Sequence, residues 1–136
     1  MKQWISNYLT AHKATLDSIP TAAVAALIDQ VRSALKEDRQ VLVFGNGGSA
    51  ADAQHIAAEL AGRMYLDRDS LPAIALTTNS SSVTAIANDY GYETIFAHQL
   101  RGLAVKGDVA FALSAGGTPP TWSWRSRRPD AGAPPS

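Results

Sequence analysis

The chain has no cysteine, no excess of charge of either sign and no long apolar run. Without cysteine, disulfide bonds and thiolate chemistry are excluded. Twelve Lys and Arg residues balance twelve Asp and Glu residues, so no surface for a polyanion is expected and nucleic acid is not a predicted partner. No apolar run approaches the roughly eighteen residues that cross a bilayer. These absences predict a cytoplasmic protein that does not bind membranes.

The length of 136 residues fits one domain, and its first 39 residues have a helical pattern. Apolar residues recur there at spacings of three, four and seven, which predicts a helix over 2–17 and a second helix from Thr21, separated at Pro20. The second helix has a wide apolar face. We expect that face to pack in the core of the same chain, and a subunit interface built by helix pairing is the alternative.

From Gln40 onward, short apolar runs alternate with helical stretches. This pattern is typical of βαβ units and predicts an α/β fold with a parallel sheet. The predicted strands are 41–44, 73–77 and 109–113, and the predicted helices between and around them are 49–65, 80–88 and 92–105. From Gly116 to Ser136 the sequence is rich in Pro, Gly and Arg and cannot build a core, so a disordered tail is predicted.

A glycine-rich stretch, GNGGSA at 45–50, connects the first predicted strand to the next helix. It matches the dinucleotide pattern G-x-G-x-x-G/A, but the second strand lacks the acidic residue that would hold a ribose, and no Gly-Lys-Ser/Thr of a P-loop follows. Backbone N–H groups of Gly47 and Gly48 at a helix start, together with the side chains of Asn46 and Ser49, instead indicate an anion-binding cradle. A sugar phosphate suits that chemistry.

The helix that follows carries His55 and Glu59, four residues apart and therefore on one face. Such a pair can form a hydrogen bond, bind one metal ion, or act as acid and base; a partly exposed pair without a catalytic role is the plain alternative. Arg63 lies four residues further along the same predicted face, where its guanidinium could hold a phosphate or a hydroxyl group.

Two more loops are rich in hydroxyl groups and follow the second and third predicted strands. They are Thr77-Thr78-Asn79-Ser80 and residues 114–118, which contain Ser114 and Thr118. Because the carboxyl ends of parallel strands meet at one edge of a sheet, we expect these loops to lie beside the glycine-rich loop and to contribute to one ligand site. Ordinary turn and helix-capping chemistry is the alternative for each.

Three stretches carry a resemblance to a known family: GNGGSAADAQHIAAELAGR, LPAIALTTNSSSVTAIANDYGYE and KGDVAFALSAGG. They closely resemble the phosphoheptose isomerases of the sugar isomerase (SIS) domain superfamily, over roughly residues 1–118. The resemblance implies a three-layer α/β/α fold with a parallel sheet of five strands, a homotetramer, bound zinc and a sugar-phosphate substrate. It also implies the interconversion of sedoheptulose 7-phosphate and D-glycero-D-manno-heptose 7-phosphate, a step in carbohydrate metabolism that leads to lipopolysaccharide.

The resemblance also implies roles for individual residues. His55 resembles a zinc ligand, Glu59 resembles both a zinc ligand and the base that moves a proton between C1 and C2, and Asp89 resembles an active-site aspartate. The substrate contacts implied by the motifs are Asn46, Gly47, Gly48, Ser49, Arg63, Asn88, Ser114 and Thr118.

The sequence departs from the family pattern after the third strand. The phosphate loop reads Ser-Ala-Gly-Gly-Thr from Ser114 to Thr118, with fewer hydroxyl groups than the family has. The later helix, which supplies a Gln and a His to zinc, has no counterpart. We therefore expect a C-terminally truncated SIS domain over 1–118, with about three of the five strands, followed by a non-family tail over 119–136 in which out-of-frame or foreign sequence begins at Thr121.

For this truncated domain, the sequence predicts impaired or absent isomerase activity. The alternative function is that of a SIS-type sugar-phosphate-binding or regulatory protein, like the DnaA initiator-associating protein. Dinucleotide binding is disfavoured because the carboxylate for the ribose is missing.

Overall fold

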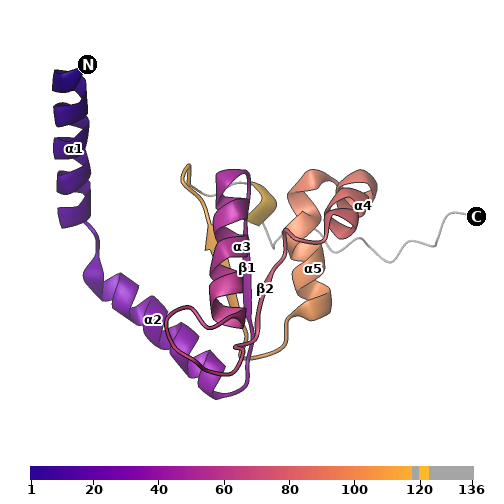
Figure 1. Cartoon of the computed structure of the whole chain (residues 1–136). Helices are drawn as coiled ribbons and strands as arrows, with labels where there is room; N and C mark the ends of the chain where they lie inside the picture. The colour runs from indigo at the N-terminus through magenta and orange to yellow at the C-terminus, as the bar shows by residue number, and fades with distance from the viewer. Residues whose placement is uncertain (118–119, 123–136) are drawn as a thin grey trace, which may run out of the picture. The chain divides into compact units, whose positions relative to one another are not determined.

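The computed structural model describes residues 1–117 and 120–122 and divides into two compact units, one from Met1 to Arg32 and one from Ser33 onward (Figure 1). The first unit contains helix α1 (Lys2–Asp17) and most of helix α2 (Thr21–Lys36), and α2 continues into the second unit. Both helices have the predicted bounds. The carbonyl oxygen of Pro20 accepts hydrogen bonds from the N–H groups of Ala23 and Val24, so the proline begins α2.

The apolar faces of these two helices are largely exposed. No residue of α1 is buried, and only Ala34 is buried in α2. Val24 and Ile28 of α2, both in the first unit, are 42% and 51% exposed. The packing of this face in the core of the same chain stays a prediction. On α1, the rings of Trp4 and Tyr8 stack with centroids 5.4 Å apart, because residues four apart in a helix lie one above the other.

The second unit is an α/β structure that alternates strands and helices. Its described elements are β1 (Val41–Gly45), α3 (Gly48–Ala61), β2 (Ala73–Ala75), α4 (Ser80–Tyr90), the 3₁₀ helix η1 (Tyr92–Thr94), α5 (Ile95–Leu103), β3 (Val109–Leu113) and the 3₁₀ helix η2 (Pro120–Trp122).

The three strands form the predicted parallel sheet, in the order β2-β1-β3. Val43 in the middle of β1 pairs with Ala75 on one side and Phe111 on the other. All five residues of β1 are buried, which explains why this strand reads as a continuous apolar run in the sequence.

Helices cover both faces of this sheet, giving three layers (Figure 1). On one face α3 contacts all three strands, and its buried residues, Ala53 and Ala57, are small enough to let it approach closely. On the other face, Leu42 and Phe44 of β1 pack with Phe96 of α5, and the two phenylalanine rings lie 4.9 Å apart. The predicted α/β fold of the SIS type is confirmed.

Two elements are shorter than the sequence predicts. Helix α3 ends at Ala61 instead of residue 65, because Gly62 adopts an extended backbone. Strand β2 ends at Ala75 instead of residue 77: the N–H of Thr78 donates to the Ala75 carbonyl oxygen and turns the chain toward α4.

The other differences lie further along the chain. Helix α4 runs to Tyr90, two residues past its predicted end at 88, and the helix predicted over 92–105 is divided into η1 and α5. In the predicted tail, residues 120–122 form η2, and residues 119 and 123–136 lie outside the described part of the chain. None of the helices in the described part is both long enough and apolar enough to span a membrane.

Candidate functional site

A cavity of about 350 Å³ lies at the carboxyl edge of the sheet, between the loop after β1 and the loop after β3. Three of the predicted ligand-binding side chains, those of Asn46, Ser49 and Ser114, are brought together there. The full lining is Asn46, Gly48, Ser49, Asp52, Leu113, Ser114, Ala115 and Gly116. The sequence-based prediction that two of these loops share one site is thus supported by their positions.

The glycines of the first loop are required by its geometry. A Cβ atom on Gly45 would lie 2.7 Å from the Cβ of Ser49 and 2.8 Å from the carbonyl oxygen of Leu113, so only glycine allows β1, α3 and β3 to meet this closely. Gly47 has a φ of 56°, in the left-handed region that favours glycine. These two positions let the chain leave β1 and begin α3 within two residues.

The start of α3 gives the cavity its electrostatic character. Backbone N–H groups in the first turn of a helix have no acceptor within the helix, and the helix dipole places partial positive charge there. Gly48 and Ser49 occupy that turn and line the cavity. The Ser49 N–H donates to the Asn46 carbonyl oxygen over 3.0 Å, so Gly48 supplies the N–H of this turn for a ligand. The Ser114 hydroxyl faces them from the other loop and accepts a hydrogen bond from the N–H of Gly116 over 3.3 Å. An anion such as a phosphate group suits this arrangement.

Sequence reasoning missed the charged residue of the cavity, Asp52. It is the only charged residue among the described residues of the lining. Its carboxylate can accept hydrogen bonds from sugar hydroxyl groups and would repel a phosphate placed beside it. Helical spacing could have identified Asp52 from the sequence, because Asp52 lies four residues after Gly48 and three before His55 and therefore on the same helix face.

The side chain of Asn46 has two protein partners that sequence reasoning also missed. Its Oδ1 accepts a hydrogen bond from the Tyr92 hydroxyl over 3.1 Å, and its Nδ2 donates to the Thr121 Oγ1 over 2.9 Å. Tyr92 and Thr121 follow Asn46 by 46 and 75 positions. Local sequence patterns cannot predict contacts between residues so far apart in the chain.

His55 and Glu59 lie on α3 outside this cavity. His55 Nε2 and Glu59 Oε1 are 3.3 Å apart, and their side chains are 76% and 38% exposed. The predicted pairing on one helix face is present. Neither residue belongs to the cavity lining, and Glu59 is seven residues beyond Asp52, the nearest lining residue of α3, which is about 10 Å along the helix axis.

The described residues do not form a zinc site around this pair. Structural and catalytic zinc ions take three or four protein ligands, usually Cys, His, Asp or Glu. No group of three or more such side chains is positioned to hold a metal ion in the part of the chain that the structure describes. His55 and Glu59 therefore supply only two of the donors that zinc requires.

Arg63 does not lie where the sequence predicts. It follows the end of α3 instead of continuing the face of His55 and Glu59, because Gly62 leaves the helix. The arginine that contacts the end of α3 is Arg68, which sequence reasoning did not single out. Its guanidinium donates to the carbonyl oxygens of Leu60 and Glu59 over 2.9 and 3.0 Å and so satisfies two acceptors that the last turn of a helix leaves free.

The remaining predicted site residues lie outside the cavity or outside the described chain. Asn88 and Asp89 are exposed at the end of α4, where the Asn88 Nδ2 donates to the Asp89 Oδ1 over 2.8 Å, and neither lines the cavity. Thr118 is not among the described residues.

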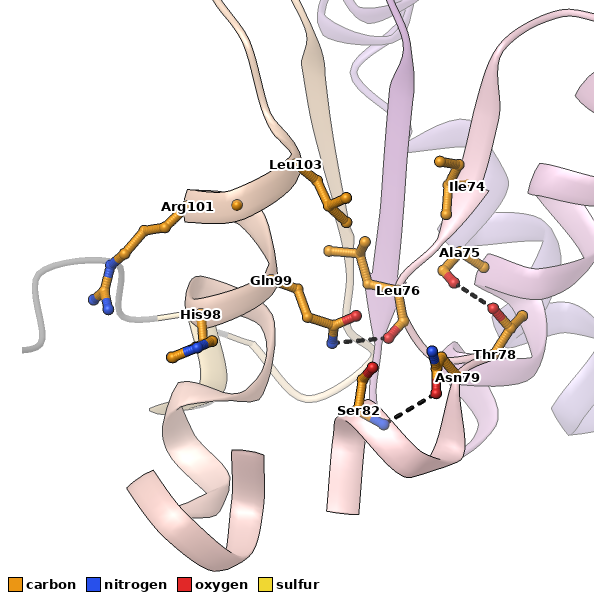
Figure 2. Close-up of a pocket in the computed structure, with 11 residues that line it drawn as sticks. Ile74, Ala75, Leu76, Thr78, Asn79, Ser82, His98, Gln99, Arg101 and Leu103 are labelled. Atoms are coloured by element: carbon orange, nitrogen blue, oxygen red, sulfur yellow. Dashed lines mark hydrogen bonds between the residues drawn. The ribbon is translucent and has the colours of Figure 1, made fainter. Parts of the chain in front are cut away.

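The loop after β2 does not join the same cavity. It lines a separate cavity of about 670 Å³ against α5, shown in Figure 2. The polar groups of this loop have internal partners: the Thr78 hydroxyl donates to the Ala75 carbonyl oxygen, and the Asn79 side chain caps α4 by accepting from the Ser82 N–H. These hydrogen bonds are the turn and helix-capping chemistry that was the alternative for this loop.

The opposite, amino edge of the sheet is held by Asp108. Its carboxylate accepts hydrogen bonds from the backbone N–H of Val105 and from both the side-chain and backbone N–H groups of Gln40. The Val105 N–H is the largest cause that lowers the pKa of Asp108; the Gln40 groups and the charge of Arg39 lower it further, while burial opposes them. This carboxylate links the residues just before β1 and β3.

Comparison with known proteins gives a consistent result. A family model described as SIS domain matches residues 7–122, which extends past the predicted boundary at 118. The phosphoheptose isomerase of Geotalea daltonii is 46% identical over 121 residues, covering 87% of this chain and 63% of that protein. The phosphoheptose isomerase of Aquifex aeolicus is 59% identical over 87 residues, covering 64% of this chain and 46% of that protein.

A solved structure shows the same similarity. A phosphoheptose isomerase from Francisella tularensis superposes with a TM-score of 0.75 at 33% identity, over 83% of this chain and 59% of that one. The chain thus spans less than two thirds of the length of these relatives. The family resemblance found in the sequence is confirmed.

Proposed function

We propose that this chain, which belongs to the SIS-domain family, binds a sugar phosphate at the carboxyl edge of its sheet. One observation carries the proposal: Asn46, Ser49 and Ser114 come from two loops and line one cavity at the first turn of α3. The Gly48 N–H of that turn suits a phosphate, and the Asp52 carboxylate suits sugar hydroxyl groups. The name of the matched relatives, phosphoheptose isomerase, supports a phosphorylated seven-carbon sugar.

The reaction that we propose for this lineage interconverts sedoheptulose 7-phosphate and D-glycero-D-manno-heptose 7-phosphate, which would feed lipopolysaccharide synthesis. A base removes a proton from C1 of the ketose and returns it to C2 through an enediol, while a hydroxyl proton passes from O1 to O2. Glu59 is the candidate base. His55 lies 3.3 Å from its carboxylate and can hold it in place. Asp89 is the candidate second acid–base group.

Zinc is the cofactor that the family resemblance implies, and it would polarise the sugar carbonyl group. The described residues do not fit it, since they bring together only His55 and Glu59 as donors. No step of the reaction is therefore assigned to zinc in this chain.

Binding without appreciable turnover is what we expect of the chain on its own. A catalytic base must reach the proton that it moves within hydrogen-bond distance. Glu59 is outside the cavity lining, about two helical turns beyond Asp52, the last residue of α3 that lines the cavity. The same separation favours the second candidate function, a SIS-type protein that binds a sugar phosphate in a regulatory role.

We also propose that the chain assembles with copies of itself, as a tetramer by analogy with the family, in the cytoplasm. The exposed apolar faces of α1 and α2 support self-association, because large exposed apolar patches mark interaction sites. The stacked rings of Trp4 and Tyr8 give the α1 face an aromatic centre. The cytoplasmic location rests on composition alone.

The test is an assay of the purified chain with sedoheptulose 7-phosphate, with and without added zinc, alongside its sedimentation. We expect saturable binding, an oligomer and little exchange of the C1 proton with solvent. Proton exchange that disappears in Glu59→Gln would show that the chain is an active isomerase and would overturn the expectation of binding without turnover. Absence of any binding would overturn the proposed function.

A further inference from the structure

The amide of Asn46 is held at both ends. The hydroxyl group of Tyr92 in η1 donates a hydrogen bond to Oδ1, and Nδ2 donates a hydrogen bond to the hydroxyl oxygen of Thr121 in η2. An asparagine side chain has two N–H donors and an oxygen that can accept twice. Each end of the Asn46 amide therefore keeps one further hydrogen-bonding position, and Asn46 lines the candidate cavity.

Thr121 is buried, and packing alone does not explain the hydroxyl group at this position. It is 3% exposed and is the one buried polar side chain among the described residues. A buried hydroxyl group needs a hydrogen-bonding partner, and the partner here is Asn46. The short helix that carries Thr121 packs against η1 and α5, so the Thr121 hydroxyl is supported by the same layer that carries Tyr92.

Tyr92 complements this contact from the other side. Its side chain is 54% exposed, so its hydroxyl group has water available and is not forced into the bond by burial. A phenol is a stronger hydrogen-bond donor than an alcohol, which favours the amide orientation with oxygen toward Tyr92 and nitrogen toward Thr121. Two segments far apart in the sequence thus fix one rotamer and one orientation of Asn46.

We propose that Tyr92 and Thr121 are positioning residues that hold the Asn46 amide for an oxygen atom of the sugar phosphate. This inference rests on the proposed function of the cavity. A side chain fixed before binding loses less conformational entropy when the ligand arrives, so the two partners raise affinity without touching the ligand. The ligand oxygen is a hydroxyl or carbonyl oxygen of the sugar, which the second N–H of Nδ2 can reach from the cavity wall.

The experiment measures sedoheptulose 7-phosphate affinity by calorimetry for the full chain and for Tyr92→Phe, Thr121→Val and Thr121→Ser. We expect three- to tenfold weaker binding for Tyr92→Phe and for Thr121→Val, with near wild-type affinity for Thr121→Ser, which keeps the hydroxyl group. Because both partners act on the same amide, the double variant Tyr92→Phe/Thr121→Val should lose less affinity than the product of the two single losses.

Two further measurements separate positioning from folding. Thermal unfolding of Tyr92→Phe should match the wild type, since the ring is half exposed and only a hydroxyl is lost. The Asn46 side-chain amide resonances, assigned from their loss in Asn46→Ala, should move toward values of a free asparagine in Tyr92→Phe and in Thr121→Val. A structural role alone would change stability and leave the affinity of the folded protein unchanged.

The outcomes are distinct. Wild-type affinity in both hydroxyl-removing variants would overturn the positioning role and leave the proposed function standing. Tighter binding by Thr121→Val would also overturn it, because Thr121 would then compete with the ligand for Asn46. If the wild-type chain does not bind the sugar phosphate, the proposed function fails, and the positioning role fails with it.

Discussion

The two edges of the sheet differ in how their polar groups are used. At the carboxyl edge, Asn46, Ser49 and Ser114 surround a cavity at the start of α3. The N–H groups of Ser49 and Ala50 donate to the carbonyl oxygens of Asn46 and Gly47, which leaves the N–H of Gly48 for a ligand. At the amino edge, Asp108 and Arg68 pair with backbone groups of their neighbours. Polar side chains that line a cavity indicate a ligand site, whereas polar side chains that pair with backbone groups away from a cavity hold the fold. The His55–Glu59 pair lies outside the cavity at the first of these edges.

The largest expected effect tests the packing of the carboxyl edge. Gly45→Ala places a Cβ atom within 2.8 Å of Ser49 and Leu113, so the free energy of unfolding should fall by about 1–3 kcal/mol. Gly48→Ala is the matched control, because its Cβ would have no neighbour within 4 Å. Urea denaturation measures both. Equal stability of the two variants would show that β1, α3 and β3 do not meet as closely as described.

The next effect tests the amino edge. The Asp108 carboxylate accepts three hydrogen bonds, and Asp108→Asn replaces one of its oxygens with an NH₂ group that cannot accept. The free energy of unfolding should therefore fall by about 1–2 kcal/mol at pH 7. Asp67→Asn, at an exposed position, is the control and should change stability by less than about 0.5 kcal/mol.

The pH dependence of this effect has a definite sign. The pKa of Asp108 is lowered in the folded state from its ordinary value of 3.8, so its ionised form stabilises the fold above that pH. The stability difference between wild type and Asp108→Asn should be constant near neutral pH and shrink as the pH falls below 3.8 through the folded-state pKa. A difference that persists unchanged in acid would contradict the hydrogen-bonded carboxylate.

A smaller effect is expected at the end of α3. Arg68→Met keeps the aliphatic stem but removes the donors to the carbonyl oxygens of Glu59 and Leu60, so unfolding should become easier by about 1 kcal/mol. Lys106→Met, at an exposed position, should change stability by no more than about 0.5 kcal/mol. If both variants behave alike, the guanidinium does not cap the helix.

The sequence was informative wherever the structure follows local patterns. The buried run of β1 and the alternation of apolar runs with helices predict the parallel sheet, and the glycine loop predicts Asn46 and Ser49 at a cavity. The end of α3 was predicted four residues too late because the apolar pattern continues past Gly62, and glycine in a helical pattern does not always end a helix. That error placed Arg63 within the helix, whereas Arg63 follows the helix end.

The parts that the sequence could not predict depend on contacts between distant residues. The loops after β1 and β2 each carry an asparagine, yet Asn79 caps α4 while Asn46 is held by Tyr92 and Thr121. Which role an asparagine takes is decided by tertiary neighbours and not by its own loop. The partner of the apolar face of α2 is open for the same reason: amphipathicity shows that a face needs a partner but not which one.

We propose that the sugar phosphate binds in the cavity that Asn46 lines, apart from the His55–Glu59 pair, which is not part of the cavity lining. Binding measurements can test that separation directly. The decisive experiment is calorimetric titration of sedoheptulose 7-phosphate into wild type, Asn46→Ala and Glu59→Gln, with Asn7→Ala on α1 as a control for an asparagine outside the cavity. We predict about tenfold weaker binding for Asn46→Ala, the equivalent of about 1.4 kcal/mol, and nearly unchanged binding for Glu59→Gln. Loss of binding in Glu59→Gln with wild-type affinity in Asn46→Ala would contradict the separation.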